Sequence, residues 1–145
     1  ARYPNARVFA PAKAMKAVGK VVAVDGTYAD APGDATVTIR HLAGIGEREG
    51  CVLVRSNDGV AAIFCDTVLN LPPKTGVLGF FLHPTGQPAV PRVTRWFFAK
   101  NLAELKGDLA TIAATDGLTR VICGHGAAIT ADAPQALRTA MATLD

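Results

Sequence analysis

The sequence contains no apolar run long enough to cross a bilayer, which takes about 20 residues of helix. Its longest apolar stretches are interrupted at Asp66, His83 or Gly124, and no positively charged start leads into an apolar secretion signal. It also lacks any block of like charges, because its 15 basic and 12 acidic residues are scattered along the chain. Since nucleic-acid binding needs clustered basic residues, we expect neither a membrane nor a nucleic acid as a partner.

Cysteine is scarce and follows no metal-binding or disulfide pattern. The three cysteines, Cys51, Cys65 and Cys123, form no CxxC motif and leave one over in any disulfide pairing. Each lies in an apolar run, so we expect buried free thiols, which are typical of a reducing compartment. A cytoplasmic location follows from this pattern.

The composition and length predict one folded domain. Half of the residues are apolar and 19% are charged, which excludes an intrinsically disordered chain. A length of 145 residues suits a single domain over 1–145. The chain starts at Ala1 rather than at a Met, and we expect the natural protein to begin earlier.

Local patterns predict an α/β domain with a mixed sheet covered by helices. Strands are expected over 8–10, 21–24, 35–42, 51–55, 60–65 and 118–123. Helices are expected over 12–18, 92–114 and 132–144, with Asp132 as the cap of the last one. Ser56-Asn57-Asp58-Gly59 predicts a hairpin turn, and the segment 69–91, rich in Pro and Gly, predicts a long loop without a regular helix. We expect Trp96, Phe97 and Phe98 to take part in helix packing or to line the rim of the site.

Two polar side chains, those of Asp66 and His125, follow almost directly on apolar strands. Binding sites in sheet-based folds favour loops just beyond strand ends. A carboxylate and an imidazole brought together there suit a Zn²⁺-type ion. Local sequence leaves two other interpretations open, with Asp66 as the cap of the following turn and His125 as a turn histidine between two glycines.

Two segments resemble motifs of the metallo-β-lactamase-like hydrolase superfamily. Cys65-Asp66-Thr67-Val68-Leu69-Asn70 is similar to the strand-end motif whose Asp bridges two metal ions in that family. Val121-Ile122-Cys123-Gly124-His125-Gly126-Ala127 resembles the late strand that ends in Gly-His-Gly, whose His is the final metal ligand. The order of the motifs and the closing helix agree as well. The resemblance implies part of an αββα sandwich with helices on one face of its mixed sheet, and Zn²⁺ held by Asp66 and His125.

The resemblance is incomplete at two of the family's metal ligands. The family's His-x-His-x-Asp-His cluster precedes these motifs and is absent, because the histidines here are the isolated His41, His83 and His125. A further family ligand, a His, corresponds in position to Glu47, whose carboxylate could complete the ligand set. Alternatively, Glu47 and Glu49 are both solvated on a loop. The resemblance therefore implies that residues 1–145 are the carboxy-terminal portion of a larger domain.

The function implied by the resemblance is metal-dependent hydrolysis, in which a metal-bound hydroxide attacks an ester, amide or phosphoester-type small-molecule substrate. Thr67 and Asn70 would hold the ligands in orientation. Because only Asp66, His125 and Glu47 are candidate ligands, we expect this chain alone to bind Zn²⁺ weakly and to be inactive.

Two alternatives belong to other classes of function. A relative that has lost its metal site would act as a scaffold or binding protein, and the replacement of the expected His by Glu47 favours this alternative. Thiol chemistry would use Cys65 or Cys123, but Asp66 beside Cys65 would raise the pKa of its thiol. In a portion of a larger domain, an exposed sheet edge would also pair with a second copy, so a homo-oligomer is expected.

Overall fold

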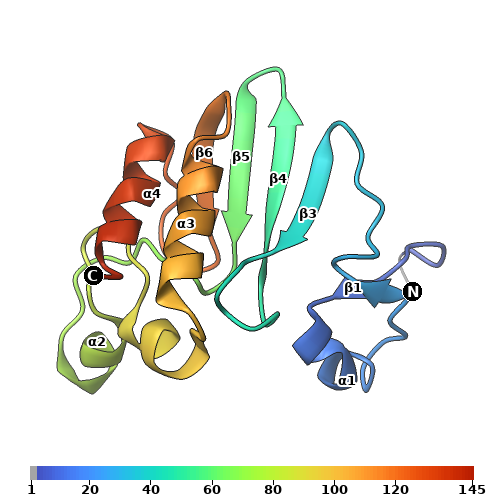
Figure 1. Ribbon diagram of the computed structural model, residues 1–145, viewed down its shortest axis with the longest axis horizontal. Helices are drawn as coiled ribbons and strands as arrows, with labels where there is room; N and C mark the ends of the chain where they lie inside the picture. Colours follow the sequence, from blue (N-terminus) through green and yellow to red (C-terminus); the bar gives the residue numbers. More distant parts are fainter. Residues whose placement is uncertain (1–2) are drawn as a thin grey trace.

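The computed structural model describes residues 3–145 and places a four-stranded sheet at the centre of the molecule (Figure 1). Its strands lie in the order β3 (Val37–His41), β4 (Gly50–Ser56), β5 (Gly59–Phe64) and β6 (Leu118–Cys123). The first three are antiparallel neighbours, whereas β6 runs parallel to β5. The predicted α/β domain with a mixed sheet is therefore confirmed.

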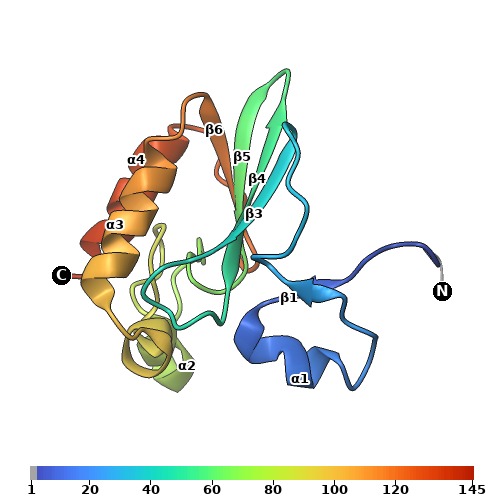
Figure 2. The same ribbon diagram turned by 45° about the vertical axis from the view of Figure 1, so that its right-hand side comes forward.

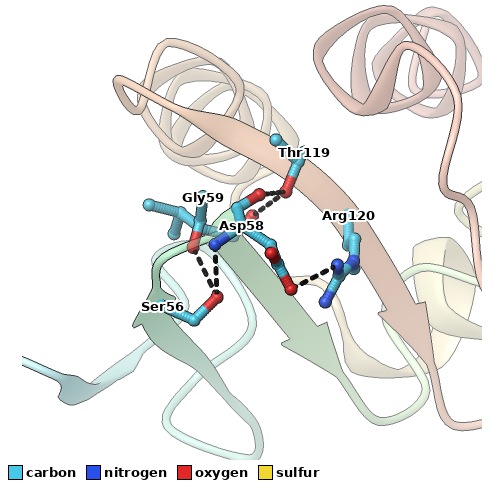
Figure 3. Close-up of polar contacts among 6 residues, drawn as sticks. Ser56, Asp58, Gly59, Thr119 and Arg120 are labelled. Atoms are coloured by element: carbon cyan, nitrogen blue, oxygen red, sulfur yellow. Dashed lines mark hydrogen bonds and ion pairs between the residues drawn. The ribbon is translucent and has the colours of Figure 1, made fainter.

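The β4–β5 hairpin turns at residues 57 and 58, as predicted. The φ angle of Gly59 is 107°, a backbone conformation that is strained for any residue with a Cβ atom. β6 braces this turn, because Thr119 Oγ1 donates to the Asp58 carbonyl at 3.1 Å and the Arg120 guanidinium pairs with the Asp58 carboxylate at 3.3 Å (Figure 3). Both charged side chains are exposed, so the ion pair contributes little to stability.

Two helices, α3 (Leu102–Ala113) and α4 (Ala133–Ala142), cover one face of the sheet (Figure 2). Alternate residues of β5 are buried against them, as the period of a strand requires, and β6 contributes Leu118, Val121 and Cys123. The core between the two layers contains fully buried side chains from both, among them Phe64, Leu105, Leu109, Val121 and Leu137.

Both helices begin at side-chain caps. The side chain of Asn101 accepts hydrogen bonds from the backbone N–H groups of Ala103 and Glu104, and that of Asp132 accepts one from Gln135. The predicted cap at Asp132 is confirmed. The last helix ends at Ala142, two residues before the predicted end.

The opposite face of the sheet is apolar and largely uncovered by residues 3–145 (Figure 2). Val52, Ile63 and Ile122 lie side by side on this face, in register across three strands. At the edges of the same face, Ile122 is 37% exposed and Val37 is 40% exposed. A sheet packed by helices on one side therefore presents an unpartnered apolar layer on the other.

A small amino-terminal unit lies beside one end of the sheet (Figure 1). Its strands β1 (Phe9–Ala10) and β2 (Gly26–Thr27) form a parallel pair, and a short η1 turn (Ala12–Ala14) leads into α1 (Met15–Val18). Its link to the sheet includes a ring contact, with the ring centroids of Tyr28 and His41 5.4 Å apart. The strand predicted over 21–24 is wrong, because this segment forms a turn and an irregular stretch.

Two further sequence predictions are wrong between β5 and α3. The supposed loop 69–91 contains a helix, α2 (Gly76–Leu82), because its prolines flank the helix. Gly79 is required within it, since a Cβ there would lie 2.5 Å from the carbonyl oxygen of Lys74. The supposed helix 92–114 is divided into a π-helical turn, η2 (Thr94–Phe98), and α3, because the backbone is extended at residues 99 and 101.

One outer edge of the sheet is occupied. Val121 in β6 and Ile129 exchange two backbone hydrogen bonds, with N–O distances of 2.9 and 2.8 Å. The other edge strand, β3, is hydrogen-bonded along one side to β4. On its outer side, the Val37 carbonyl accepts from Asp34 N–H at 3.0 Å, and Val37 N–H donates to the Asp34 carboxylate at 2.6 Å. Across residues 3–145, no helix is long and apolar enough to cross a membrane.

Candidate functional site

The side chains of Asp66 and His125 meet at one edge of the sheet. Phe64 and Cys123 are paired at the ends of the parallel strands β5 and β6, and each site residue lies two positions further on. Parallel strands end at the same edge, so their following loops converge. The His125 Nε2 and Asp66 Oδ1 atoms are 3.2 Å apart, and both side chains are more than 60% exposed. The convergence that the sequence predicted is present.

The two loops that carry these residues are joined by backbone hydrogen bonds. Gly124 N–H donates to the Cys65 carbonyl at 3.1 Å, and Asn70 N–H donates to the His125 carbonyl at 3.2 Å. The Asn70 side chain adds a bond from Nδ2 to the Ala127 carbonyl at 2.9 Å. Asn70 therefore orients the His125 loop through the backbone, without touching the imidazole in these contacts.

Both glycines beside His125 are required by this close approach. A Cβ on Gly124 would lie 2.5 Å from the Cys65 carbonyl oxygen. Gly126 has a φ of 98°, and a Cβ there would collide with the carbonyl group of Asn70. The Gly-His-Gly sequence is thus explained by geometry within the loop pair.

Glu49, and not Glu47, extends towards the strand-end loop. One carboxylate oxygen of Glu49 accepts from the N–H groups of Cys65 at 2.8 Å and Thr67 at 3.2 Å. The other accepts from the N–H of Asp66 at 3.1 Å and from the hydroxyl of Thr67 at 2.8 Å. Glu49 therefore fixes the backbone on both sides of Asp66, a role that the sequence did not predict.

Glu47 occupies a left-handed turn with a φ of 56°, and its carbonyl accepts from Lys13 N–H at 3.2 Å. Its side chain does not line either of the two pockets at Asp66. The prediction of Glu47 as the third ligand thus gains no support, because the turn directs Glu49 to the site in its place. The sequence contains two carboxylates here, Glu47 and Glu49, and its pattern does not show which of them reaches the site.

Two adjoining pockets open beside Asp66. One of about 190 Å³ reaches towards η2, where Thr94 and Phe98 form its wall. The other, of about 400 Å³, reaches towards the amino-terminal unit and is lined by Tyr28. Asp66, Glu49 and Arg48 line both, so each pocket combines two carboxylates with one guanidinium.

The cysteines form no disulfide, as predicted, but one of them is exposed. Cys65 lies just past the end of β5, where partial burial, followed in size by the charges of Asp66 and Glu49, raises the pKa of its thiol. Burial raises the pKa of Cys51 to about 12 and that of Cys123 to about 11. All three thiols are therefore protonated at neutral pH, which argues against thiol chemistry.

The candidate site has few side chains that could bind a metal ion. Within residues 3–145, no cluster of three or more His, Cys, Asp or Glu side chains is arranged to hold a metal ion. Comparison with known proteins adds no evidence on this site, because no protein-family model and no curated protein matches the chain. Asp66 and His125, braced by Glu49 and the two loop glycines, remain the best-defined candidate site.

Proposed function

We propose that the chain is the carboxy-terminal, ligand-bearing portion of a metallo-β-lactamase-like hydrolase. The single observation that carries the proposal is the 3.2 Å separation of Asp66 Oδ1 and His125 Nε2 at the ends of adjacent parallel strands. Two ligands of one tetrahedral zinc ion, each about 2.0–2.1 Å from the metal, lie about 3.3 Å apart. The pair thus has the spacing that a shared ion requires.

The uncovered face of the sheet supports the αββα part of the proposal. Helices cover one face, while Val52, Ile63 and Ile122 leave an apolar layer on the other. In a sandwich, a second sheet packs about 10 Å away against such a layer. We propose that this second sheet, together with the remaining ligands, is supplied by residues outside the 145 of this chain.

The donor set fits a zinc site only in part. A catalytic zinc site generally takes three protein ligands, and Asp66 with His125 supplies two. Glu49 is committed to four donors of the loop 65–67, so its role is to position Asp66 rather than to bind the ion. The ion itself would supply Lewis acidity and a lowered pKa of bound water.

The pockets define what this chain would contribute to substrate binding. Arg48 would bind an anionic group, with its guanidinium held over the ring of Phe98 at 5.7 Å from the centroid. Thr94 fixes the wall of the smaller pocket to the site, since its hydroxyl donates to the Asp66 carbonyl at 3.3 Å. An ester, amide or phosphoester with a neighbouring negative charge is the substrate class that these groups accept.

Calorimetric titration of the chain with Zn²⁺ tests the proposal. We expect weak binding, with a dissociation constant above about 1 μM, that is lost in both Asp66→Asn and His125→Ala. His83→Ala is the matched control, because His83 lies on the loop after α2 and should leave binding unchanged. Zn²⁺ binding that survives both site substitutions would reject the site. Sub-micromolar, stoichiometric binding would reject the claim that ligands are missing.

A non-catalytic scaffold is the second candidate, and the two-ligand count favours it. In that case the Asp66–His125 contact is a structural bridge between two loops. The unsubstituted chain and His125→Ala would then both lack Zn²⁺ affinity, and the melting temperature would change little because the pair is more than 60% exposed. The same set of variants therefore separates the two functions.

A further inference from the structure

Helix α2 lies beside η2 (Figures 1 and 2). Apolar and aromatic side chains of the two elements form an exposed cluster. We call it the aromatic surface, and its members are Val77, Leu78, Phe80, Phe81, Trp96 and the aliphatic and guanidinium groups of Arg92. Val77 is 77% exposed, Leu78 is 65% exposed, and Phe80 and Trp96 are each 52% exposed. Contiguous apolar exposure of this kind marks a contact surface on a folded domain.

The cluster is continuous across the two elements. The ring centroids of Phe80 and Trp96 are 5.8 Å apart, and those of Phe80 and Phe81 are 5.6 Å apart. The Arg92 guanidinium lies 4.8 Å from the centroid of Phe80 and 5.9 Å from that of Trp96. A cation is therefore fixed within the aromatic group, at the level of the exposed rings.

The segment that carries this surface has charges of only one sign. No Asp or Glu occurs from 67 to 103, although the chain has 12 acidic residues. The basic residues of the segment are Lys74, Arg92, Arg95 and Lys100. One acidic residue approaches from outside, as the Asp145 carbonyl accepts from Arg95 at 3.1 Å, but the Asp145 carboxylate pairs with Lys106. Arg92 is the one charged side chain among the members of the aromatic surface, so the surface carries positive charge and is complementary to an anionic partner.

We propose that the aromatic surface docks on an anionic lipid bilayer, with Val77 and Leu78 inserted among the headgroups and Lys74 and Arg92 held at lipid phosphates. Trp and Phe beside Lys and Arg are the side chains that favour the bilayer interface. The proposal departs from the expectation of no membrane partner, which rested on the lack of a spanning segment, because a surface contact needs no helix that spans the membrane. It also does not rest on the proposed hydrolase function, since neither Asp66 nor His125 takes part.

The chemistry of α2 favours lipid over a protein partner. Residues 76–82 carry no polar side chain, so the most exposed part of the surface offers no side-chain hydrogen bond. A protein interface holds about one hydrogen bond per 100–200 Å², whereas the apolar boundary of a bilayer requires none. The surrounding positive charge then supplies attraction to anionic headgroups.

Trp96 provides a direct test, because it is the only tryptophan of the chain. Its emission is recorded with vesicles of phosphatidylcholine alone and with vesicles that contain about one third phosphatidylserine. We expect a blue shift with the anionic vesicles and co-flotation of the protein with them, and much weaker binding to the neutral vesicles. Salt should weaken the binding, because Lys74 and Arg92 contribute through their charges.

Two substitutions test the residues, each with a matched control. Val77→Asp should lower partitioning about tenfold, while Val21→Asp, on a residue 89% exposed in the amino-terminal unit, should not. An Asp in the first turn of α2 is compatible with the helix, so folding is retained. Lys74→Glu should lower partitioning about fivefold or more, whereas Lys20→Glu should have little effect.

The proposal is overturned if anionic vesicles cause no shift, or if Val77→Asp binds them as well as the unsubstituted protein does. A blue shift with polyglutamate in place of vesicles would identify an acidic protein as the partner. A concentration-dependent shift without vesicles would identify a second copy of the chain on this surface. Either result would also reject the bilayer.

Discussion

Replacement of Glu49 by Gln should loosen the loop that carries Asp66. The carboxylate of Glu49 accepts four hydrogen bonds, from three backbone N–H groups and one hydroxyl. An amide retains one acceptor oxygen, and its NH₂ group faces the two donors that the second oxygen had bound. Hydrogen bonds to charged groups contribute about 1.5–3 kcal/mol each, and water replaces part of this at a half-buried site. We therefore expect a loss of about 2 kcal/mol for Glu49→Gln and about 3 kcal/mol for Glu49→Ala.

The matched control is Glu47→Gln, two positions away on the same loop. The Glu47 carboxylate lines neither pocket at Asp66, so its loss should cost less than about 0.5 kcal/mol. Thermal unfolding followed by circular dichroism measures both, and a loss of about 2 kcal/mol lowers the melting temperature by about 6 °C in a domain of this size. Equal melting temperatures for the two Gln variants would refute the assignment of Glu49 as the brace of the Asp66 loop.

Three further outcomes follow from the described contacts. Gly126→Ala should destabilise the protein by more than about 2 kcal/mol in urea unfolding, because φ is 98° and the added Cβ would collide with the Asn70 carbonyl. An unchanged unfolding midpoint would reject the tight loop pairing. Asp108→Asn should lower the free energy of unfolding by about 3 kcal/mol in the same assay, because Asp108 is 7% exposed, pairs with Arg40 and accepts from Ala43 N–H at 2.9 Å. A loss under about 1 kcal/mol would contradict this. Cys65 should be the one cysteine of the native protein that a thiol reagent modifies. Its modification should be slower than that of free cysteine at pH 7 and should accelerate as the pH rises, because its raised pKa leaves less thiolate at neutral pH. Fast or multiple modification, detected by mass spectrometry after timed labelling, would contradict this.

The strands of the site were predictable because their signals are local. Apolar runs before Asp66 and His125 identify β5 and β6, and the Asp58-Gly59 turn identifies the hairpin that fixes their neighbours. Convergence of the two polar residues follows from strand ends alone. The glycines around His125 were also visible, although the partner that requires Gly126 to be a glycine, the carbonyl of Asn70, is distant in sequence.

Neither the role of Glu49 at the Asp66 loop nor the exposed aromatic surface was predictable from such local strand and turn patterns. The choice between Glu47 and Glu49 depends on a left-handed turn at Glu47, which sequence patterns do not specify for a non-glycine residue. The predicted helix 92–114 joined Phe98 to the residues of α3, whereas the extended backbone between η2 and α3 separates them. Trp96, Phe97 and Phe98 were expected in helix packing or at the rim of the site. Trp96 and Phe97 are exposed, whereas Phe98 lines one of the pockets at Asp66.

The hydrogen bonds between Val121 and Ile129 have a consequence for assembly. They occupy the outer side of β6 at Val121, in the strand that leads to His125. The outer side of β3 is held in a similar way, because Asp34 accepts from the N–H of Val37 and donates to its carbonyl. A second copy that adds a strand would therefore have to displace a local contact at either edge, which makes each edge a poorer template for pairing than a bare strand.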